Sequence, residues 1–293
     1  MKKIIPILLL AFLFFQCTSS KKVTSATSNT KILDLNKPED NLEAFMKMRA
    51  SLKDGEETTY YWTGTIYSYI PGERSIPLFN LEACNIGKTI KVEDGYQFVT
   101  RETAIYRDLN TNKILSKWYN PWIKDSVDVV TCWNDPVNQQ YMLKGKYGEW
   151  GVPFTKMGDG RVVMYSDIFL LYPSALKKAE FPENSRSDNY QAAELFQFFL
   201  DEKEINKNAN SVYSEVGWTR ISDYLPWLRM SDKPGNLVYQ CRGYKLVGGK
   251  ILPADFQAFI QANQPQFLHA PEKYSTPNMT SWKYFKLLKE KNK

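Results

Sequence analysis

Short, mainly apolar runs rich in tyrosine, tryptophan, valine, isoleucine and threonine fill residues 58–143. Polar breaks separate these runs at residues 71–72, 94–95, 110–112 and 134–136, where proline, glycine, asparagine and aspartate typical of turns occur. The break at 94–95 is Asp-Gly, which suits a hairpin because glycine accepts the positive φ that such a turn requires. The pattern predicts an antiparallel meander.

A different spacing, with large side chains every three or four residues, predicts helices. One is expected to begin at Pro38, because proline suits the first helical turn, and to end before Asp54-Gly55. A second is expected at 189–200, where good helix formers carry apolar residues on most faces. Two closing helices are expected at 253–262 and 281–288.

Further strands are expected at 161–172, 212–221 and 237–247. Residues 144–160 carry five glycines and a proline without helical or strand period, which is typical of a rim or lid loop. The predicted fold is a β-rich α+β domain, a curved antiparallel sheet or barrel-like meander with a few packed helices. We expect a single globular domain over residues 33–293.

The N-terminus predicts export. Lys2 and Lys3 precede an apolar run at 4–15 that is too short to cross a bilayer core of about 30 Å. The run ends at Cys17, so residues 1–16 are expected to be a signal peptide and Cys17 a lipidated first residue. The alternative is an ordinary secretory signal with an incidental cysteine. Residues 17–32, rich in serine, threonine and lysine, are expected to be a flexible tether. The expected location is a membrane-anchored lipoprotein of the bacterial envelope, on the periplasmic or outer-membrane side.

Composition excludes several classes of function. Loss of Lys2 and Lys3 with the signal leaves 36 basic against 32 acidic residues, a net charge of +4 that gives no footprint for nucleic acid. One histidine rules out metal centres that need two or more. Phosphate-binding, dinucleotide-binding and nucleophile-elbow motifs are missing from the sequence. We therefore expect no metal and no cofactor.

The remaining cysteines, Cys84, Cys132 and Cys241, allow at most one disulfide and show no Cys-x-x-Cys spacing. Each lies in an apolar, strand-like segment. Buried free thiols are the favoured interpretation.

Aromatic side chains are the most distinctive chemistry. On the predicted strand that begins near residue 58, odd-numbered positions from Tyr61 to Tyr69 share one face if the strand is regular. Such a row can line a pocket for a planar or apolar ligand, or it can be an aromatic ladder that packs the sheet. The predicted wall comprises Tyr61, Trp62, Tyr67, Trp118, Trp133, Trp218 and Trp227, with Arg220, Arg242 and Asp167 as polar handles.

Acid–base chemistry has fewer candidates. Asp135 lies in a segment that also suits a structured turn, and Asp167 is a charge inside an apolar strand. An inward pair between Asp167 and Arg220 or Arg242 would either brace the core or clamp a carboxylate. In a catalytic interpretation Asp135 or Asp167 is the base, Tyr165 the acid, and an arginine the clamp. His269 is the single histidine that a Ser-His or Cys-His site can use, although a structural hydrogen-bonding role is favoured.

Seven phrases together resemble a bacterial and fungal family named "domain of unknown function 1838". The resemblance covers nearly the whole folded part, from about Leu33 to about Phe285, and implies no catalytic or binding residues. Many relatives look exported by a twin-arginine leader, whereas this chain has Lys2-Lys3 and Cys17. The phrases are LDLNKPEDNLEAFMKMRASL from Leu33, YYWTGTIYSYIPGE from Tyr60, YRDLNTNKIL from Tyr106, VVTCWNDPVN from Val129, YQAAELFQFF from Tyr190, WTRISDYLPWLRMSDKPGNLVYQCRGYKL from Trp218 and PNMTSWKYF from Pro277.

Three functions follow as hypotheses. The first is an envelope lipoprotein that binds a small apolar or aromatic molecule in an aromatic-lined cavity. The second is a cofactor-free acid–base enzyme, an isomerase, cyclase or hydrolase acting on a hydrophobic substrate. The third is a structural or partner-binding lipoprotein, which predicts a large exposed apolar patch and no cavity. An enzyme needs a carboxylate at the cavity wall, whereas a carrier can leave its carboxylates on the rim.

Overall fold

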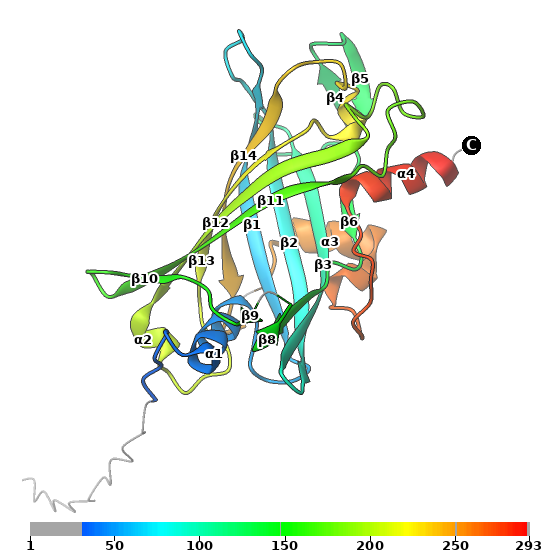
Figure 1. The fold of residues 1–293 in the computed structure, drawn as a ribbon. Coiled ribbons are helices and arrows are strands. Elements are labelled where there is room, and N and C mark those ends of the chain that lie inside the picture. Colours follow the sequence, from blue (N-terminus) through cyan, green and yellow to red (C-terminus); the bar gives the residue numbers. More distant parts are fainter. Residues whose placement is uncertain (1–30, 147, 250, 292–293) are drawn as a thin grey trace, which may run out of the picture. The chain divides into compact units, whose positions relative to one another are not determined.

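A computed structural model describes residues 31–146, 148–249 and 251–291, and the unit Lys31–Lys293 is considered by itself. Its main feature is one antiparallel sheet, as the sequence predicts (Figure 1), and this sheet has ten strands. Its two ends do not pair with each other within the described residues, so the sheet is not closed into a barrel. The order is β10 (Phe154–Met157), β11 (Arg161–Pro173), β12 (Asn189–Asp201), β13 (Glu215–Ser222), β14 (Asn236–Leu246), β1 (Glu57–Tyr69), β2 (Pro77–Val92), β3 (Gly95–Arg107) and β6 (Cys132–Asn134), with β7 (Gln139–Met142) also on β3.

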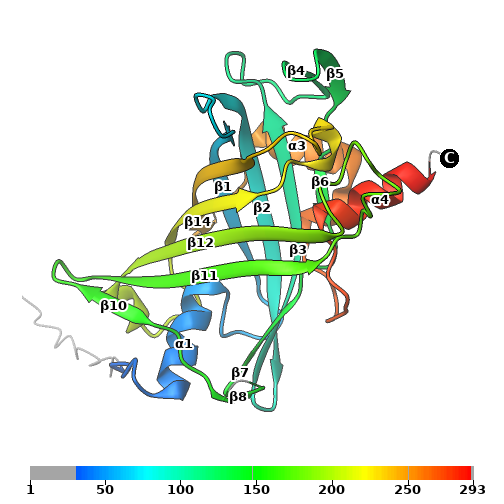
Figure 2. The same cartoon turned by 45° about the horizontal axis from the view of Figure 1, so that its top comes forward.

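The sheet curls until its two halves face each other. Figure 2 shows β11 and β12 running across β2 and β3. Register fixes which side chains point inward, because directly opposed residues on antiparallel strands share a face. Trp62 on β1 opposes Gly243 on β14 and Ala83 on β2, and Ala83 in turn opposes Ala104 on β3. On β1 and β11–β13, the residues with even numbers point to this face, which we call the inner face.

Helices cover the ends and the outer face. The helices are α1 (Pro38–Arg49), α2 (Glu202–Ile205), α3 (Ala254–Asn263) and α4 (Ser281–Lys291), and the short hairpins are β4 (Lys117–Asn120) with β5 (Asp125–Asp128) and β8 (Lys144–Gly145) with β9 (Gly148–Glu149). The outer face of β1–β3 packs against α3 through a cluster that includes Tyr61, Ile105 and Phe256. Among the described residues, no helix combines the length and the apolarity needed to span a membrane.

A buried lysine fixes the C-terminal end of α1. The helix begins at Pro38 with acidic residues in its first turn, as the sequence predicts, and ends at Arg49. Lys245 on β14, fully buried, donates to the carbonyls of Lys47 (2.7 Å), Met48 (3.1 Å) and Ala50. Burial lowers the pKa of Lys245 well below its ordinary value. These bonds satisfy carbonyls that a helix end otherwise leaves unpaired, and they hold α1 against the sheet.

Two expectations differ from the structure. Residues 189–200 form strand β12, not a helix, because thirteen consecutive positions pair with β11 and eight with β13. The extended ladder outweighs the helix propensity of the alanine, glutamate, leucine and glutamine residues. Residues 144–160 are not a plain loop, since they contain β8, β9 and β10. The closing helices occur as α3 and α4.

Candidate functional site: the cavity inside the curled sheet

A cavity of about 780 Å³ lies on the inner face. Its walls come from both halves of the sheet, with β11–β13 on one side and β1–β3 on the other. The α1 residues Phe45 and Arg49 line one part, β7 contributes Tyr141, and the segment 278–283 leading into α4 lines another. The volume lies within the range of about 300–1,000 Å³ that small-molecule sites occupy.

Aromatic rings form much of the wall. On β12 and β13, Phe196 stacks between Phe198 (5.9 Å) and Trp218 (6.1 Å), and Trp218 lies 5.8 Å from Tyr239 on β14. Across the cavity, Trp62 stacks on Tyr60 at 5.4 Å. Gly243 makes room for the Trp62 ring, because a Cβ there would lie 2.5 Å from its Cδ1. The wall therefore offers large apolar area with indole and phenol groups.

A carboxyl group, Glu102, lies in the wall formed by β3. It opposes Asn85 on β2 and Asn134 on β6, so all three side chains share the inner face. Asn85 Nδ2 donates to Glu102 Oε1 at 3.4 Å, and Asn134 Nδ2 to Oε2 at 3.5 Å. Burial raises the pKa of Glu102, and the charge of Glu194 raises it further. The carboxyl is held by two long amide contacts inside an apolar cavity.

Arg49 lies beside this carboxyl at the end of α1. Its Nη2 donates to Asn85 Oδ1 at 3.2 Å, so the Asn85 amide connects the guanidinium to Glu102. The guanidinium also lies over the rings of Tyr60 (5.3 Å) and Phe98 (4.7 Å). Lys245 and the packing of α1 thus determine where this charge sits.

A second charged group lies on the opposite wall. Arg220 on β13 opposes Glu194 on β12, and its Nη1 lies 3.3 Å from Glu194 Oε1. Nη2 donates to the Tyr190 hydroxyl, and the guanidinium lies 5.6 Å from the centre of the Tyr239 ring. Glu194 is therefore paired with a cation, unlike Glu102, for which no salt bridge occurs within the described residues.

Several polar atoms of the lining side chains are buried without a hydrogen-bond partner among the described residues. Leaving such a group unpaired costs roughly 1–3 kcal/mol. A polar ligand that enters the cavity is one way to satisfy them. They are Arg49 Nη1, Trp62 Nε1, Thr103 Oγ1, Asn134 Oδ1, Trp218 Nε1 and Arg220 Nε.

Of the sequence-predicted ligand residues, the structure places Trp62, Trp218 and Arg220 in the cavity wall. Tyr61 lies on the outer face under α3, where its ring is 6.4 Å from Phe256. The expected shared face of Tyr61, Tyr67 and Tyr69 is therefore the outer one. The other predicted members, Tyr67, Trp118, Trp133, Trp227 and Arg242, do not line the cavity either.

Each of these has another environment. Trp118 and Trp227 pack on Phe79 at 5.5 Å, within the core. Trp133 stacks on Phe259 at 6.0 Å, on the outer face. Arg242 is exposed and pairs with Glu215. Period-two alternation defines which residues share a face of the sheet. Because both faces carry aromatic rings, alternation alone does not identify the face that encloses the cavity.

The predicted catalytic residues lie outside the cavity. Asp167 and Tyr165 are exposed on the outer face of β11, while their neighbour Ser166 lines the cavity. The expected inward pair of Asp167 with Arg220 or Arg242 is not formed. Asp135 is paired with Arg101 at 2.7 Å, and the His269 side chain is 74% exposed, with Nδ1 3.5 Å from Glu57.

Sequence reasoning missed Glu102, Glu194 and Arg49. A signal existed for Glu102, because the Asp94-Gly95 turn fixes the phase of β3 and puts Glu102 on one face with Phe98, Thr100 and Ala104. A carboxylate within such a face is a buried-charge candidate. Arg49 is recognisable as the basic end of α1, but its place in the cavity depends on tertiary contacts.

Thiol and metal chemistry find little support in the described part of the chain. Cys84, Cys132 and Cys241 are free and buried. Burial raises the pKa of each thiol to about 12, which keeps these groups protonated and weakly nucleophilic. No group of three or more histidine, cysteine, aspartate or glutamate side chains able to hold a metal ion occurs among these residues.

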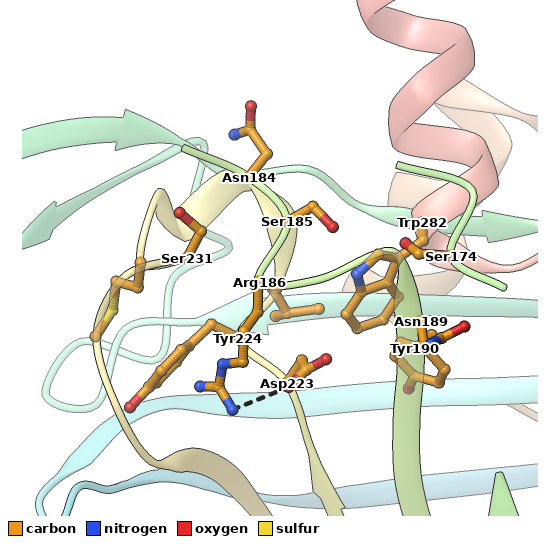
Figure 3. Close-up of a pocket in the computed structure, with 12 residues that line it drawn as sticks. Ser174, Asn184, Ser185, Arg186, Asn189, Tyr190, Asp223, Tyr224, Ser231 and Trp282 are labelled. Carbon is orange, nitrogen blue, oxygen red and sulfur yellow. Dashed lines mark ion pairs between the residues drawn. The ribbon is translucent and has the colours of Figure 1, made fainter. Parts of the chain in front are cut away.

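A second, smaller space lies beside the cavity, between Tyr190, Trp282 and the ion pair of Arg186 with Asp223 (Figure 3). Its volume is about 10 Å³, which admits roughly one water molecule. It is too small for an organic ligand. The 780 Å³ cavity is therefore the better candidate site.

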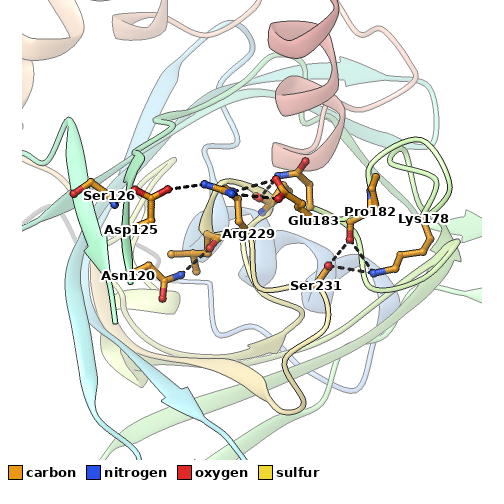
Figure 4. A network of polar contacts seen from close by, with 11 residues as sticks. Asn120, Asp125, Ser126, Lys178, Pro182, Glu183, Arg229 and Ser231 are labelled. Atoms are coloured by element: carbon orange, nitrogen blue, oxygen red, sulfur yellow. Dashed lines mark hydrogen bonds and ion pairs between the residues drawn. The ribbon is translucent and has the colours of Figure 1, made fainter. Parts of the chain in front are cut away.

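A polar network connects the loops that contain Lys178, Glu183 and Arg229 (Figure 4). Arg229 contacts Glu183 at 3.1 Å and Asp125 at 2.9 Å, and so joins the segment before β12 to the hairpin β4–β5. Lys178 Nζ donates to Ser231 Oγ at 3.1 Å. These contacts hold the loops in place, and none of the residues that make them lines the cavity.

Comparison with known proteins adds the family but no activity. A family model described as "Protein of unknown function (DUF1838)" matches residues 55–289, which include β1–β14 and α3. A search among curated proteins finds no match to this chain.

Proposed function

Since this chain belongs to the family described as "Protein of unknown function (DUF1838)", we propose its function from the cavity: it binds a small, mainly apolar or aromatic molecule inside the curled sheet. The observation that carries this proposal is the 780 Å³ volume walled by Trp62, Phe196 and Trp218. Burial of apolar ligand surface contributes roughly 25 cal/mol per Å². A cavity of this kind also favours ligand binding over a purely structural role, which needs none.

We also propose that the binding takes place at the cell envelope. The support is the signal-like segment 1–16 and Cys17, which lie outside the described residues. A lipid on Cys17 and the tether 17–32 would keep the domain near a membrane, where apolar molecules concentrate. Small-molecule binding and membrane attachment would then act together.

The first test is native mass spectrometry of the full chain, purified gently from the source envelope. A small molecule that stays bound and is lost on denaturation would support the proposal and reveal its chemical class. Binding of the neutral dye N-phenyl-1-naphthylamine to the purified chain, followed by fluorescence, gives a second readout. It does not depend on a natural ligand that stays bound during purification.

A matched pair of variants locates the binding. Ala83→Phe puts a ring into the cavity from β2, while Ala193→Phe puts the same ring on the outer face of β12, opposite Phe169. We expect the first to weaken dye binding at least about tenfold and the second to leave it unchanged. Equal effects from both variants, or no dye binding by the wild-type chain, would overturn the proposal.

A further inference from the structure

Among the described residues, the Glu102 carboxyl is unusual because it opens onto the cavity and has no salt bridge, although Arg49 lies nearby. It is partly exposed, and the exposed part belongs to the cavity wall. Its contacts are the Asn85 and Asn134 amides at 3.4 and 3.5 Å, both longer than a typical charge-assisted hydrogen bond. A carboxyl held this loosely has lone pairs left for a bound molecule.

Charged groups face Glu102 from three other elements. Arg49 on α1 is connected to it through Asn85, Glu194 lies on β12, and Arg220 on β13 is engaged by Glu194 at 3.3 Å. Cys132 on β6 faces the same space as a protonated thiol. Burial and the charge of Glu194 raise the pKa of Glu102, while the two arginines lower it, and the net direction is upward. A carboxyl with a raised pKa is the usual form of a general base or acid that works near neutral pH.

We infer that Glu102 is a catalytic general base that exchanges a proton with the ligand of this cavity, and that the substrate class is an apolar ketone with a C–H bond next to its carbonyl. This inference rests on the proposed binding function and deepens it. It assigns Arg49, one amide away from Glu102, to the carbonyl oxygen. Asn85 positions both groups, since it accepts from Arg49 and donates to Glu102.

The chemical step needs no co-reactant. The Glu102 carboxylate takes the proton, the C–H bond breaks, and its electron pair moves into the C–C bond while the carbonyl π pair moves to oxygen, giving an enolate. The Arg49 guanidinium stabilises the developing negative charge. Protonated Glu102 then returns the proton to the same carbon or, in an unsaturated ketone, to the carbon two positions further along. The net reaction is isomerisation, or deuterium exchange in heavy water.

Other groups in the described chain fit this role less well. Asp135 is paired with Arg101 and does not line the cavity, and Asp167 and Tyr165 are on the outer face. Glu194 lines the cavity, but its carboxylate is already paired with the Arg220 guanidinium at 3.3 Å. Geometry thus singles out Glu102.

The experiment follows deuterium uptake by 2-tetralone, a small apolar ketone, in heavy-water buffer by proton NMR, with the full chain. Tryptophan quenching by the same ketone measures its Kd. We expect the wild-type chain to accelerate exchange over buffer and Glu102→Gln to remove about 100-fold or more of that acceleration, with Kd changed less than threefold. Glu102→Asp should retain part of the rate. The wild-type rate should rise with pH as the carboxyl ionises.

Controls separate this inference from simple binding. Glu272→Gln removes an exposed carboxyl outside the cavity and should leave exchange unchanged. Bound 2-tetralone without accelerated exchange, or acceleration that survives in Glu102→Gln, would overturn the catalytic inference and leave the binding proposal intact. If the naphthylamine dye binds but 2-tetralone does not, ketone chemistry is likewise excluded. If neither binds, the proposed function fails and the inference fails with it.

Discussion

Two glutamates on neighbouring central strands have opposite environments. Glu82 on β2 points to the outer face, where it is 4% exposed, accepts from the Tyr61 hydroxyl at 2.7 Å and contacts Arg107 at 2.5 Å. Arg107 also binds Asp255 at 2.7 Å. Glu102 on β3 points to the inner face and has two long amide contacts and no salt bridge within the described residues.

The two glutamates differ in how completely the polar groups around them are paired. Around Glu82 every charge has a hydrogen-bonded counterpart, which is the condition under which a buried ion pair is tolerated in a fold. Around Glu102, the Arg49 and Asn134 side chains keep unpartnered atoms. A half-satisfied polar network is costly for folding and is commonly retained where a ligand completes it. The outer cluster therefore braces α3 to the sheet, and under the proposed function a bound ligand completes the inner one.

The largest expected effect comes from breaking the outer cluster. Arg107→Met would leave Glu82 buried without its cation, so we expect a loss of about 3–5 kcal/mol in the free energy of unfolding. Urea-induced unfolding followed by tryptophan fluorescence measures it. The control Arg161→Met removes the exposed Arg161–Asp159 pair and should change the free energy of unfolding far less than Arg107→Met does, because water screens that pair. A similar small loss for Arg107→Met would contradict the comparison.

Much of this fold follows from the sequence, but strand β12 does not. The turn residues and the 3.6-residue spacing predict the meander and the helices α1, α3 and α4. They fail at β12, where residues with helical propensity pair with strands on both sides. Local preference is weaker than a two-sided ladder of backbone hydrogen bonds.

The candidate site is predictable only in its chemistry. The tyrosine and tryptophan content is compatible with either a pocket wall or a packed aromatic ladder, and of the predicted wall residues Trp62, Trp218 and Arg220 line the cavity. The predicted acid–base residues Asp167 and Tyr165 lie outside the cavity, because they are one residue out of phase with the inner face of β11. A charge inside an apolar strand indicates that one face is special, but tertiary packing decides which face is buried against α3 and which encloses space.

A smaller effect, of opposite sign, is expected at Glu102. Because its pKa is raised in the folded protein, the folded state holds this proton more tightly than the unfolded state does. That stability is fully present below the unfolded pKa and is lost as pH rises through the folded pKa. Above it the wild-type chain keeps a disfavoured charge, which Glu102→Gln does not have.

We therefore expect Glu102→Gln to be more stable than wild type by roughly 1 kcal/mol at pH 8, and equal to it at pH 4. Thermal unfolding at both pH values tests this. Glu272→Gln, at an exposed carboxyl, is the matched control. A variant less stable than wild type at both pH values would show that Glu102 braces the fold in the same way as Glu82.

The smallest effect tests whether burial or the number of ion pairs sets these energies. Arg229 resembles Arg107 in holding two carboxylates, Glu183 at 3.1 Å and Asp125 at 2.9 Å, but its side chain is 38% exposed against 8% for Arg107 (Figure 4). Water and salt screen such contacts, so Arg229→Met should cost no more than about 1 kcal/mol in low salt and less at high ionic strength. Urea unfolding at two salt concentrations measures this. A loss as large as that of Arg107→Met would mean that paired charges stabilise this fold wherever they lie, and the contrast between Glu82 and Glu102 would then need another cause.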